Sequence, residues 1–486
     1  MSPLLNPEEL RDKVFSEGWS EPLGGTAEVR EPATGEPLAR VGFASAADVR
    51  AAAGRAAAAQ PAWGAAHPAE RAAVLRRAAR VLEEAREEVA RWLIREGGGT
   101  RGKAEYEVGA VIDEFWAAAA LPERPGGHLL PSEPGRASVG RRVPLGVVGV
   151  ISPWNVPLLL GMRAAAPALA LGNAVVLKPD PHTPVSGGWA AARIFEEAGL
   201  PPGVLHVLPG GAEAGSALVE DPDVAMIAFT GSTAVGRRVG ETAGRLLKRA
   251  SLELGGNNAL IVLDDADLDA AASAGAWASF FHSGQICMTA GRHIVLESVA
   301  ERYVERLVER AGKLRVGDPW REDVDLGPLI SGAQLERVQR IVGESVAAGA
   351  VVRTGAAHED LCYRPTVLTG VTREMPAFRE EIFGPVAPVV VVADEEEAVA
   401  VANDTEYGLS AAVQTGSAER GLAVAGRLRT GLVHVNDQTI NDEAHIPFGG
   451  RGASGNGSRH GSENNWDEFT QWQWLTVRGA ARPFPF

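Results

Sequence analysis

The sequence predicts an α/β protein whose parallel sheets are covered by helices on both faces. Short runs of β-branched residues alternate with helical stretches from Val143 onward, which is the pattern of strand–helix–strand units. The runs form two successive series, and this indicates two α/β domains. The length of 486 residues agrees with this reading, because it gives a prior of about three domains with a large buried core.

Composition and charge exclude several other classes of protein. Hydrophobic residues make up 45% of the chain and charged residues 22%, as in ordinary globular proteins, so a disordered chain is excluded. The formal net charge of −15 disfavours nucleic acid and anionic membranes as partners. No membrane span is expected, because Arg163, Pro167 and Asn173 interrupt the most apolar stretch.

The cysteines and the N-terminus indicate a cytoplasmic protein. Cys287 and Cys362 are too few for a disulfide framework, and no Cys/His spacing predicts a metal site. A reducing compartment fits two free thiols. The first residues lack a basic segment followed by a long apolar one, so no secretory signal is expected.

The first strong element is an amphipathic helix predicted over Pro68–Glu96. Proline is tolerated at the first helical position, and Gly97–Gly99 would end the helix. Apolar side chains recur at steps of three and four with Arg and Glu between them: Val74, Ala78, Val81, Ala85, Val89 and Trp92.

Two series of predicted strands follow, with a domain boundary expected near Gly255–Gly256. The first series is Val147–Ile151, Ala174–Leu177, Val204–Leu208, Val224–Phe229 and Ala259–Leu263. The second series is Arg292–Leu296, Pro388–Val392, Ala411–Gln414 and Leu432–Asn436.

Two segments lie outside this alternation. Pro122–Arg142 is rich in Pro and Gly and is predicted to be an excursion from the first domain. The tail Glu463–Phe486 is rich in Trp and Phe, so we expect it to pack on another surface, such as a second subunit.

Two glycine-rich segments are candidate phosphate sites. Gly450-x-Gly452-x-x-Gly455 fits the dinucleotide fingerprint, but it does not stand between a strand and a helix, so we interpret it as a loop. Residues 230–236 do follow a buried strand, and their backbone N–H groups suit a phosphate. The alternative is an ordinary strand-to-helix turn.

Four side chains carry potential chemistry, each beside a simpler interpretation. Cys287 follows Gly284 and suits a nucleophile, or is an inert buried thiol. Glu253, at the end of an apolar strand, suits a general base, or is a surface carboxylate. Asn155 suits an oxyanion donor, or caps a helix. Lys178 suits a ribose or phosphate contact, or is solvated.

Together these residues resemble the aldehyde dehydrogenase superfamily. Six short motifs follow one another in the order of that family: PWN, LKP, FTGST, LELGG, GQIC and EIFGP. The similarity runs from the Pro68 helix to the loop at Phe448. The wording GQICMTAGRHIV and the segment VNDQTINDEAHIPFGGRGASGNGSRHG are similar to the benzaldehyde dehydrogenase branch.

The resemblance implies a fold and a domain plan. It implies a doubly wound Rossmann-like dinucleotide-binding domain over 1–121 and 143–255, and an α/β catalytic domain over 256–453. Residues 122–142 and 454–486 would form a small β oligomerisation arm. That arm would pair subunits as a homodimer or homotetramer.

The resemblance also implies catalytic roles. Cys287 would attack the aldehyde, and Asn155 with the backbone N–H of Cys287 would hold the oxyanion of the thiohemiacetal. Glu253 would activate the water that hydrolyses the thioester. No metal ion is implied.

NAD or NADP is the cofactor that the resemblance implies. The contacts would come from these residues: Trp154, Lys178, Gly231, Ser232, Gly236, Glu381 and Phe383. Many NAD-specific members carry a Glu where this chain has Pro181. Without that carboxylate a 2′-phosphate is not repelled, although Asp180 restores part of the charge, so both cofactors stay open.

The expected lining suits a planar or aliphatic apolar aldehyde, and the resemblance implies a benzaldehyde-like aromatic one. The expected pocket residues are apolar: Val156, Leu160, Ile286, Met288 and Phe448. Arg163 suits a carboxylate or a ring hydroxyl, or is simply ion-paired. The alternatives are an aliphatic or semialdehyde dehydrogenase, a redox-independent cysteine hydrolase, and a non-catalytic protein that kept the fold.

Overall fold

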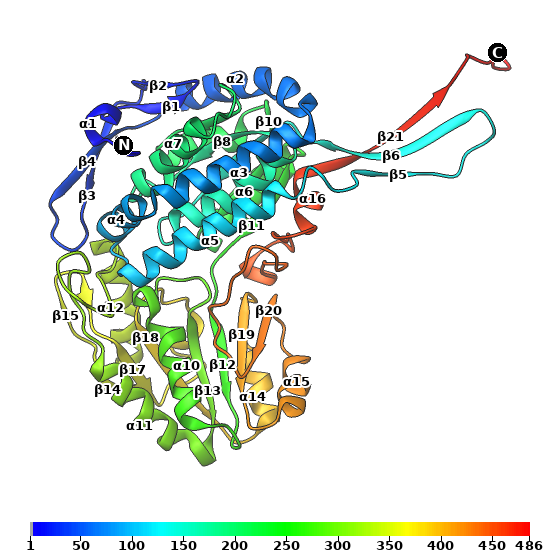
Figure 1. Cartoon of the computed structure of the whole chain (residues 1–486). Helices are drawn as coiled ribbons and strands as arrows, with labels where there is room; N and C mark the ends of the chain where they lie inside the picture. The colour runs from blue at the N-terminus through cyan, green and yellow to red at the C-terminus, as the bar shows by residue number, and fades with distance from the viewer. Residues whose placement is uncertain (1–2) are drawn as a thin grey trace.

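Two seven-stranded sheets form the framework of the molecule in the computed structural model, which describes residues 3–486 (Figure 1). The first sheet has the order β11 (Arg249–Glu253), β10 (Val224–Thr230), β7 (Val147–Ile151), β8 (Ala174–Lys178), β9 (Leu205–Val207), β1 (Val14–Ser16) and β2 (Trp19–Ser20). The second has the order β14 (Val351–Thr354), β17 (Thr366–Thr369), β18 (Val386–Val392), β13 (Ala290–Leu296), β12 (Asn258–Val262), β19 (Ser410–Gln414) and β20 (Leu432–Val435).

The predicted α/β class and the doubly wound order are confirmed in the first sheet. Strands β8 and β9 extend it on one side of β7, and β10 and β11 extend it on the other, all in parallel. Both faces are buried, because Val148 and Val150 pack in one apolar cluster while Val147 and Ile151 pack in another. Strands of this kind read as continuous apolar runs.

The prediction of wholly parallel sheets is wrong at one edge of each. Strand β1 pairs with β9 antiparallel, and β14 pairs with β17 antiparallel. β1 comes from the N-terminal segment, ahead of the helices that make the parallel crossovers. β14 and β17 are joined without a helix, and a parallel pair needs a long crossover.

The predicted first series contains one misplaced strand. Ala259–Leu263 corresponds to β12, which pairs with β13 and β19 in the second sheet. The first sheet ends instead at β11, and the chain changes sheets between Glu253 and Asn258. An apolar run fits the middle of either sheet equally well, so periodicity could not assign it.

The single helix predicted over Pro68–Glu96 is two helices. α3 (Pro68–Glu84) and α4 (Arg86–Gly97) meet at Ala85, whose φ of −95° and ψ of 11° are not helical. A break of one residue leaves the apolar spacing almost unchanged, so the sequence did not reveal it. The chain then leaves α4 through Gly98 at a φ of 68°, within the predicted glycine stop.

Helices cover the sheets on both sides. In Figure 1, α3, α5 and α6 lie side by side across the first sheet. The remaining helices have these bounds: α1 Pro7–Leu10, α2 Ala46–Ala65, α5 Arg101–Ala119, α6 Pro157–Ala170, α7 Ala190–Glu197, α8 Ala212–Glu220, α9 Thr233–Arg245, α10 Leu268–Phe280, α11 Glu297–Lys313, α12 Gly332–Ala347, α13 Pro376–Arg379, α14 Glu395–Ala402, α15 Ala418–Ala425 and α16 Asn464–Phe469. Within residues 3–486, no helix is both long and apolar enough to cross a membrane.

Short elements complete the fold. They are the hairpin β3 (Thr26–Arg30) and β4 (Pro37–Gly42), the pair β15 (His358–Glu359) and β16 (Cys362–Tyr363), the π-turn η1 (Val185–Trp189), and the 3₁₀ turns η2 (Phe281–Gly284) and η3 (Gly452–Ser454). Gly450–Gly455 is therefore a loop with a single 3₁₀ turn, as the sequence indicated.

A three-stranded antiparallel arm projects from the body (Figure 1). β6 (Arg136–Pro144) is its central strand, between β5 (Gly127–Leu129) and β21 (Thr470–Arg478). The tail strand thus joins a segment more than three hundred residues earlier in the chain. Residues 454–469 lie outside the arm, because α16 packs on the body through the fully buried Phe469.

Candidate active site

Polar residues gather where the parallel strands of the first sheet end. Trp154 and Asn155 follow β7, Lys178 ends β8, Ser232 follows β10 and Glu253 ends β11. Carboxyl ends of parallel strands lie at one edge of a sheet, which is where α/β proteins bind ligands. The chain continues from this edge directly into the second sheet.

The second sheet brings Cys287 to this edge on a loop between η2 and β13. Asn258 holds the loop, since its Nδ2 donates to the carbonyl oxygens of Cys287 at 2.9 Å and Thr289 at 2.7 Å. The Oδ1 of Asn258 accepts a hydrogen bond from the Ser410 N–H at 2.9 Å. Asn258 therefore holds the backbone of Cys287, the candidate nucleophile, in place.

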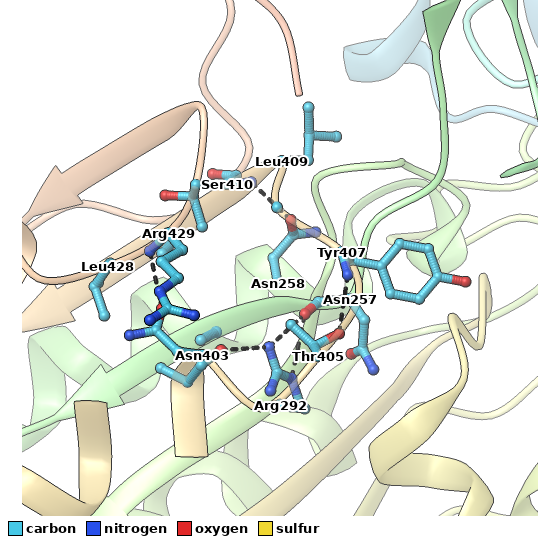
Figure 2. A pocket seen from close by; sticks show the side chains of 15 residues that line it. Asn257, Asn258, Arg292, Asn403, Thr405, Tyr407, Leu409, Ser410, Leu428 and Arg429 are labelled. Atoms are coloured by element: carbon cyan, nitrogen blue, oxygen red, sulfur yellow. Dashed lines mark hydrogen bonds between the residues drawn. The ribbon is translucent and has the colours of Figure 1, made fainter. Parts of the chain in front are cut away.

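The polar pocket behind this loop, shown in Figure 2, has a structural role. Its buried Arg292 donates to the carbonyl oxygens of Asn257, Val401 and Ala402. These bonds tie β13 to the end of α14. Figure 2 places Arg292 and Asn257 beside each other, with Asn258 next to them.

Left-handed backbone precedes the cysteine. His282, Ser283 and Gly284 have φ values of 50°, 54° and 68°. A Cβ on Gly284 would lie 2.1 Å from the Gly384 oxygen, so only glycine fits there. The Ser283 hydroxyl donates to the Gly327 oxygen at 2.7 Å and helps to hold this turn. The two non-glycine left-handed residues carry no sequence signal.

Asn155 connects the two sheets beside Cys287. Its side chain is buried, and Nδ2 donates to the Gln285 carbonyl oxygen at 2.9 Å. An amide nitrogen carries two hydrogens, so one remains for a ligand. Asn155 and Cys287 both line one cavity.

Glu253 is buried at 6% exposure, and in the described part of the chain neither carboxylate oxygen has a hydrogen-bond partner. Burial raises its pKa to about 8, against the opposing charges of Arg163 and Arg459. The loop after Phe448 lies against the carboxylate, since a Cβ on Gly449 would lie 2.9 Å from Glu253 Oε1 and Gly455 forms a β-bridge with Glu253. A carboxyl group with such a pKa suits proton transfer near neutral pH.

The Cys287 thiol is half-buried and protonated at neutral pH. Burial raises its pKa to about 12, and the charges of Glu381 and Glu253 add to the effect. A thiolate therefore needs a proton acceptor or a positive charge brought in by a ligand. Cys362 lies later in the chain, in β16, and lacks the neighbours described for Cys287.

The turn after β10 fits a pyrophosphate. α9 begins at Thr233, and among residues 3–486 no side chain caps its first turn, so its N–H groups are left for a ligand. Gly236 allows close packing, because a Cβ there would lie 2.2 Å from Leu254 Cδ2. Gly231 is also confined, because a Cβ there would lie 2.7 Å from the Phe229 ring.

Lys178 and the residues after it fit an adenosine ribose. The Lys178 Nζ donates to the Gly210 oxygen at 2.9 Å, and burial lowers its pKa. Pro181 is exposed and offers no carboxylate. Asp180 accepts hydrogen bonds from the His182 backbone N–H at 2.9 Å and pairs with the His182 ring Nδ1 at 2.8 Å.

Glu381 and Phe383 approach the same edge from the second domain. Glu381 Oε1 accepts the Gly256 N–H at 2.8 Å, and burial raises the Glu381 pKa to about 7. Phe383, at a φ of 57°, meets Trp154 edge to face with ring centroids 5.4 Å apart. These residues could hold a dinucleotide along this edge of the sheets.

The cavity at Cys287 contains all five expected pocket residues and several others. Its apolar wall consists of Val156, Leu159, Leu160, Phe281, Ile286, Met288, Ile440 and Phe448. Its polar members besides Asn155 are Lys103, Tyr106, Arg163 and Asp442. Of these four, the sequence indicated only Arg163. Asp442 lay within the late segment that resembles the benzaldehyde branch, whereas Tyr106 lies outside every motif.

A wider, open pocket adjoins this cavity. Lys103, Tyr106, Phe281 and Ile440 line both spaces. In the wider pocket, Trp277 and Phe281 stack with centroids 4.6 Å apart and an interplanar angle of 18°. In the described part of the chain, no cluster of three or more His, Cys, Asp or Glu could hold a metal ion.

Comparison with known proteins agrees with this geometry. A family model described as "Aldehyde dehydrogenase family" matches residues 19–475. The chain is 55% identical over 99% of both lengths to a vanillin dehydrogenase of Amycolatopsis sp., and 51% identical over 98% of both to an NAD⁺ benzaldehyde dehydrogenase of Pseudomonas putida. The crystal structure of Staphylococcus aureus betaine aldehyde dehydrogenase with NAD⁺ superposes with a TM-score of 0.95 at 28% identity, covering 99% of this chain and 97% of that one.

Proposed function

The chain belongs to the aldehyde dehydrogenase family, and we propose that it oxidises an aromatic aldehyde to the carboxylic acid with NAD or NADP. It is an oxidoreductase that acts on the aldehyde group. The observation that carries the aromatic assignment is the cavity at Cys287, which is apolar on one side and adjoins a wider pocket that holds a stacked Trp277–Phe281 pair.

Cys287 is the proposed nucleophile. Its thiol proton passes to the ionised Glu253 carboxylate, whose charge acts on the thiol, and from there to solvent. The thiolate sulfur then bonds to the aldehyde carbon, and the carbonyl π electrons move to the oxygen. The free amide hydrogen of Asn155 and the backbone N–H of Cys287 would stabilise this oxyanion. The fixed carbonyl of Cys287, held by Asn258, keeps the peptide in place during the change of charge.

Glu253 is the proposed base for release of the acid. In its ionised form it takes a proton from water while the water oxygen attacks the thioester carbon and Cys287 leaves as thiolate. Both carboxylate oxygens lack partners in the described residues, so they are available to a water molecule.

When bound, the nicotinamide supplies the two-electron acceptor for the oxidation. The first turn of α9 and Lys178 would hold the pyrophosphate and adenosine ribose, and Glu381 would hold the nicotinamide ribose. Trp154 and Phe383 would enclose the ring. Pro181 in place of a carboxylate supports acceptance of NADP as well as NAD.

The names of the relatives support an aromatic substrate over the aliphatic and semialdehyde alternatives. Vanillin and benzaldehyde dehydrogenases match the chain at 55% and 51% identity over almost its full length. The test is reduced-nicotinamide formation by purified protein with benzaldehyde and NAD or NADP, beside Cys287→Ser. We expect turnover that the variant loses.

Two results would overturn the proposal. Turnover of aliphatic aldehydes alone would refute the aromatic assignment. Ester hydrolysis with no dependence on nicotinamide in any aldehyde reaction would favour the cysteine hydrolase instead.

The arm supports a homodimer or homotetramer in the cytoplasm. Leu129, Trp472 and Trp474 are exposed on it at 86%, 52% and 66%, which is unusual for a surface that stays in water. A reducing cytoplasm would keep the Cys287 thiol free for catalysis.

A further inference from the structure

The cavity at Cys287 has a polar side that the proposed reaction does not use. Arg163 and Asp442 line it, and both are buried. We propose that these two side chains bind a hydroxyl group on the ring of the substrate, so that hydroxylated benzaldehydes are preferred. This inference rests on the proposed aromatic substrate and narrows it.

Arg163 brings one free donor. Its Nε faces Glu114 Oε1 at 3.4 Å, and its Nη2 is hydrogen-bonded to Asp442 Oδ2. Within residues 3–486, Nη1 is buried without a hydrogen-bond partner. The guanidinium lies 4.5 Å from the centroid of the Phe448 ring, which also lines the cavity.

Asp442 brings one free acceptor on the carboxylate that pairs with Arg163. Its Oδ2 pairs with Arg163, while Oδ1 is buried and unpartnered in the described part of the chain. The Tyr106 hydroxyl donates to the Asp442 carbonyl oxygen at 3.3 Å, so α5 also holds this residue in place. Unpaired buried polar atoms are costly, and a pair of them at a ligand cavity indicates a ligand group.

The chemistry of the pair selects among substituents. A hydroxyl both donates and accepts, so it can satisfy Asp442 Oδ1 and Arg163 Nη1 together. A methoxy group only accepts and leaves the aspartate oxygen unpaired. A carboxylate group on the substrate would be repelled by the negative charge of Asp442. Acidic semialdehydes, which Arg163 alone would attract, are therefore disfavoured.

The experiment compares each hydroxybenzaldehyde with its methoxy partner, which is close to it in size and electronic effect. Reduced-nicotinamide formation is measured with benzaldehyde, with 3- and 4-hydroxybenzaldehyde, and with the corresponding methoxy and carboxy compounds. We expect at least one hydroxy isomer to exceed its methoxy partner and benzaldehyde about tenfold or more in kcat/KM. Competitive inhibition by hydroxybenzyl and benzyl alcohols measures the same preference without the chemical step.

Variants locate the effect. Asp442→Asn keeps the size of the side chain but removes its charge and one acceptor oxygen, so we expect the ratio of kcat/KM for the hydroxy compound over its methoxy partner to fall towards one. Glu443→Gln is the matched control, because it lies next in the chain and, within residues 3–486, Glu443 pairs only with the exposed His445. It should leave every ratio unchanged.

The outcomes are distinct. Equal rates and equal inhibition for hydroxy and methoxy partners would overturn this inference and leave the aromatic assignment standing. A preference unchanged in a folded Asp442→Asn variant would overturn it too. Failure to oxidise any aromatic aldehyde would overturn both proposals. If Asp442→Asn does not fold, the inhibition series on the unmodified enzyme decides.

Discussion

At the residue scale, Cys287 and Glu253 differ in how close each is to titrating at neutral pH. Both are ionisable groups whose pKa values burial raises, to about 12 and about 8. At neutral pH the thiol therefore waits for a ligand to change its surroundings, whereas the carboxyl is close to titrating. Neighbouring groups with separated pKa values are typical of acid–base sites.

The raised pKa of Glu253 predicts a pH dependence. Below about pH 8 the carboxyl is mainly protonated and cannot accept a proton from water. We therefore expect thioester hydrolysis to speed up as pH rises and to level off above about pH 8. Stopped-flow decay of the acyl-enzyme across pH measures this. Glu253→Gln should show no inflection, and an unmodified enzyme without one would contradict the assignment of the base.

The pair Asp180–His182 predicts how cofactor preference changes with pH. The hydrogen bond to Asp180 raises the pKa of His182 above its ordinary value of 6.5. As pH falls through that pKa the ring becomes cationic, so the 2′-phosphate of NADP is attracted. We expect the ratio of kcat/KM for NADP over NAD to rise with falling pH, and to rise less in His182→Ala.

The variant is needed because the phosphate itself titrates near pH 6. A pH dependence that is identical in the unmodified enzyme and in His182→Ala would contradict the prediction.

Site residues differ in how visible they are in sequence. Cys287, Glu253 and Asn155 could be predicted, because each belongs to a short motif at a strand end or tight turn. Tyr106 and Asp442 could not be predicted as partners, because 336 residues separate them and only the tertiary fold brings them together. The unpartnered Oδ1 of Asp442 becomes visible only in three dimensions.

At the element scale, the loop that carries Cys287 combines strain with tight packing. Three successive left-handed residues lead into it, and the Gly384 carbonyl lies against Gly284. Backbone strain of this kind persists only where the surroundings hold it.

Gly284→Ala is expected to destabilise the protein by about 2 kcal/mol or more and to reduce activity strongly. The added Cβ costs about 1–2 kcal/mol in left-handed backbone, and its overlap with the Gly384 oxygen must also be relieved. Denaturant unfolding and kcat/KM measure the two effects.

Gly343→Ala in α12 is the matched control. A Cβ there meets nothing within 4 Å, so the variant should be neutral or slightly more stable. Equal stability of both alanine variants would contradict the account of the loop.

Elements were predicted well where the spacing of apolar residues determines them. They were predicted poorly where a single residue decides a helix break or a change of sheet. The central strands of both sheets follow from apolar runs with their turns, whereas β1, β2, β14 and β17, at or beside the sheet edges, were not predicted. The break at Ala85 and the change of sheet before β12 do not follow from such runs, because each alters direction without altering the pattern.

At the scale of the whole molecule, two sheets of different sequence origin make one site. The first supplies Asn155 and Glu253, and the second supplies Cys287 and Glu381. The hydrogen bonds of Asn155 to Gln285 and of Gly256 to Glu381 hold the two sides together. A ligand that bridges both sides should therefore stabilise the folded chain.

The arm predicts assembly. Trp474 is exposed on β21, and we expect Trp474→Glu to shift the protein from a dimer or tetramer towards a smaller species in light scattering with size exclusion. Leu23→Glu is the control, because Leu23 is also a highly exposed apolar residue but lies on the body. This variant should leave the mass unchanged. A monomeric unmodified protein would refute the role of the arm.

The covalent role of Cys287 can be tested directly by intact-protein mass spectrometry. Glu253→Gln is incubated with benzaldehyde or 4-hydroxybenzaldehyde and NAD, and the site of any acyl group is mapped by peptide analysis. Without the base the thioester should accumulate, as one acyl group per chain on Cys287, and be absent from Cys287→Ser. No adduct, or an adduct on Cys362, would contradict the proposed mechanism.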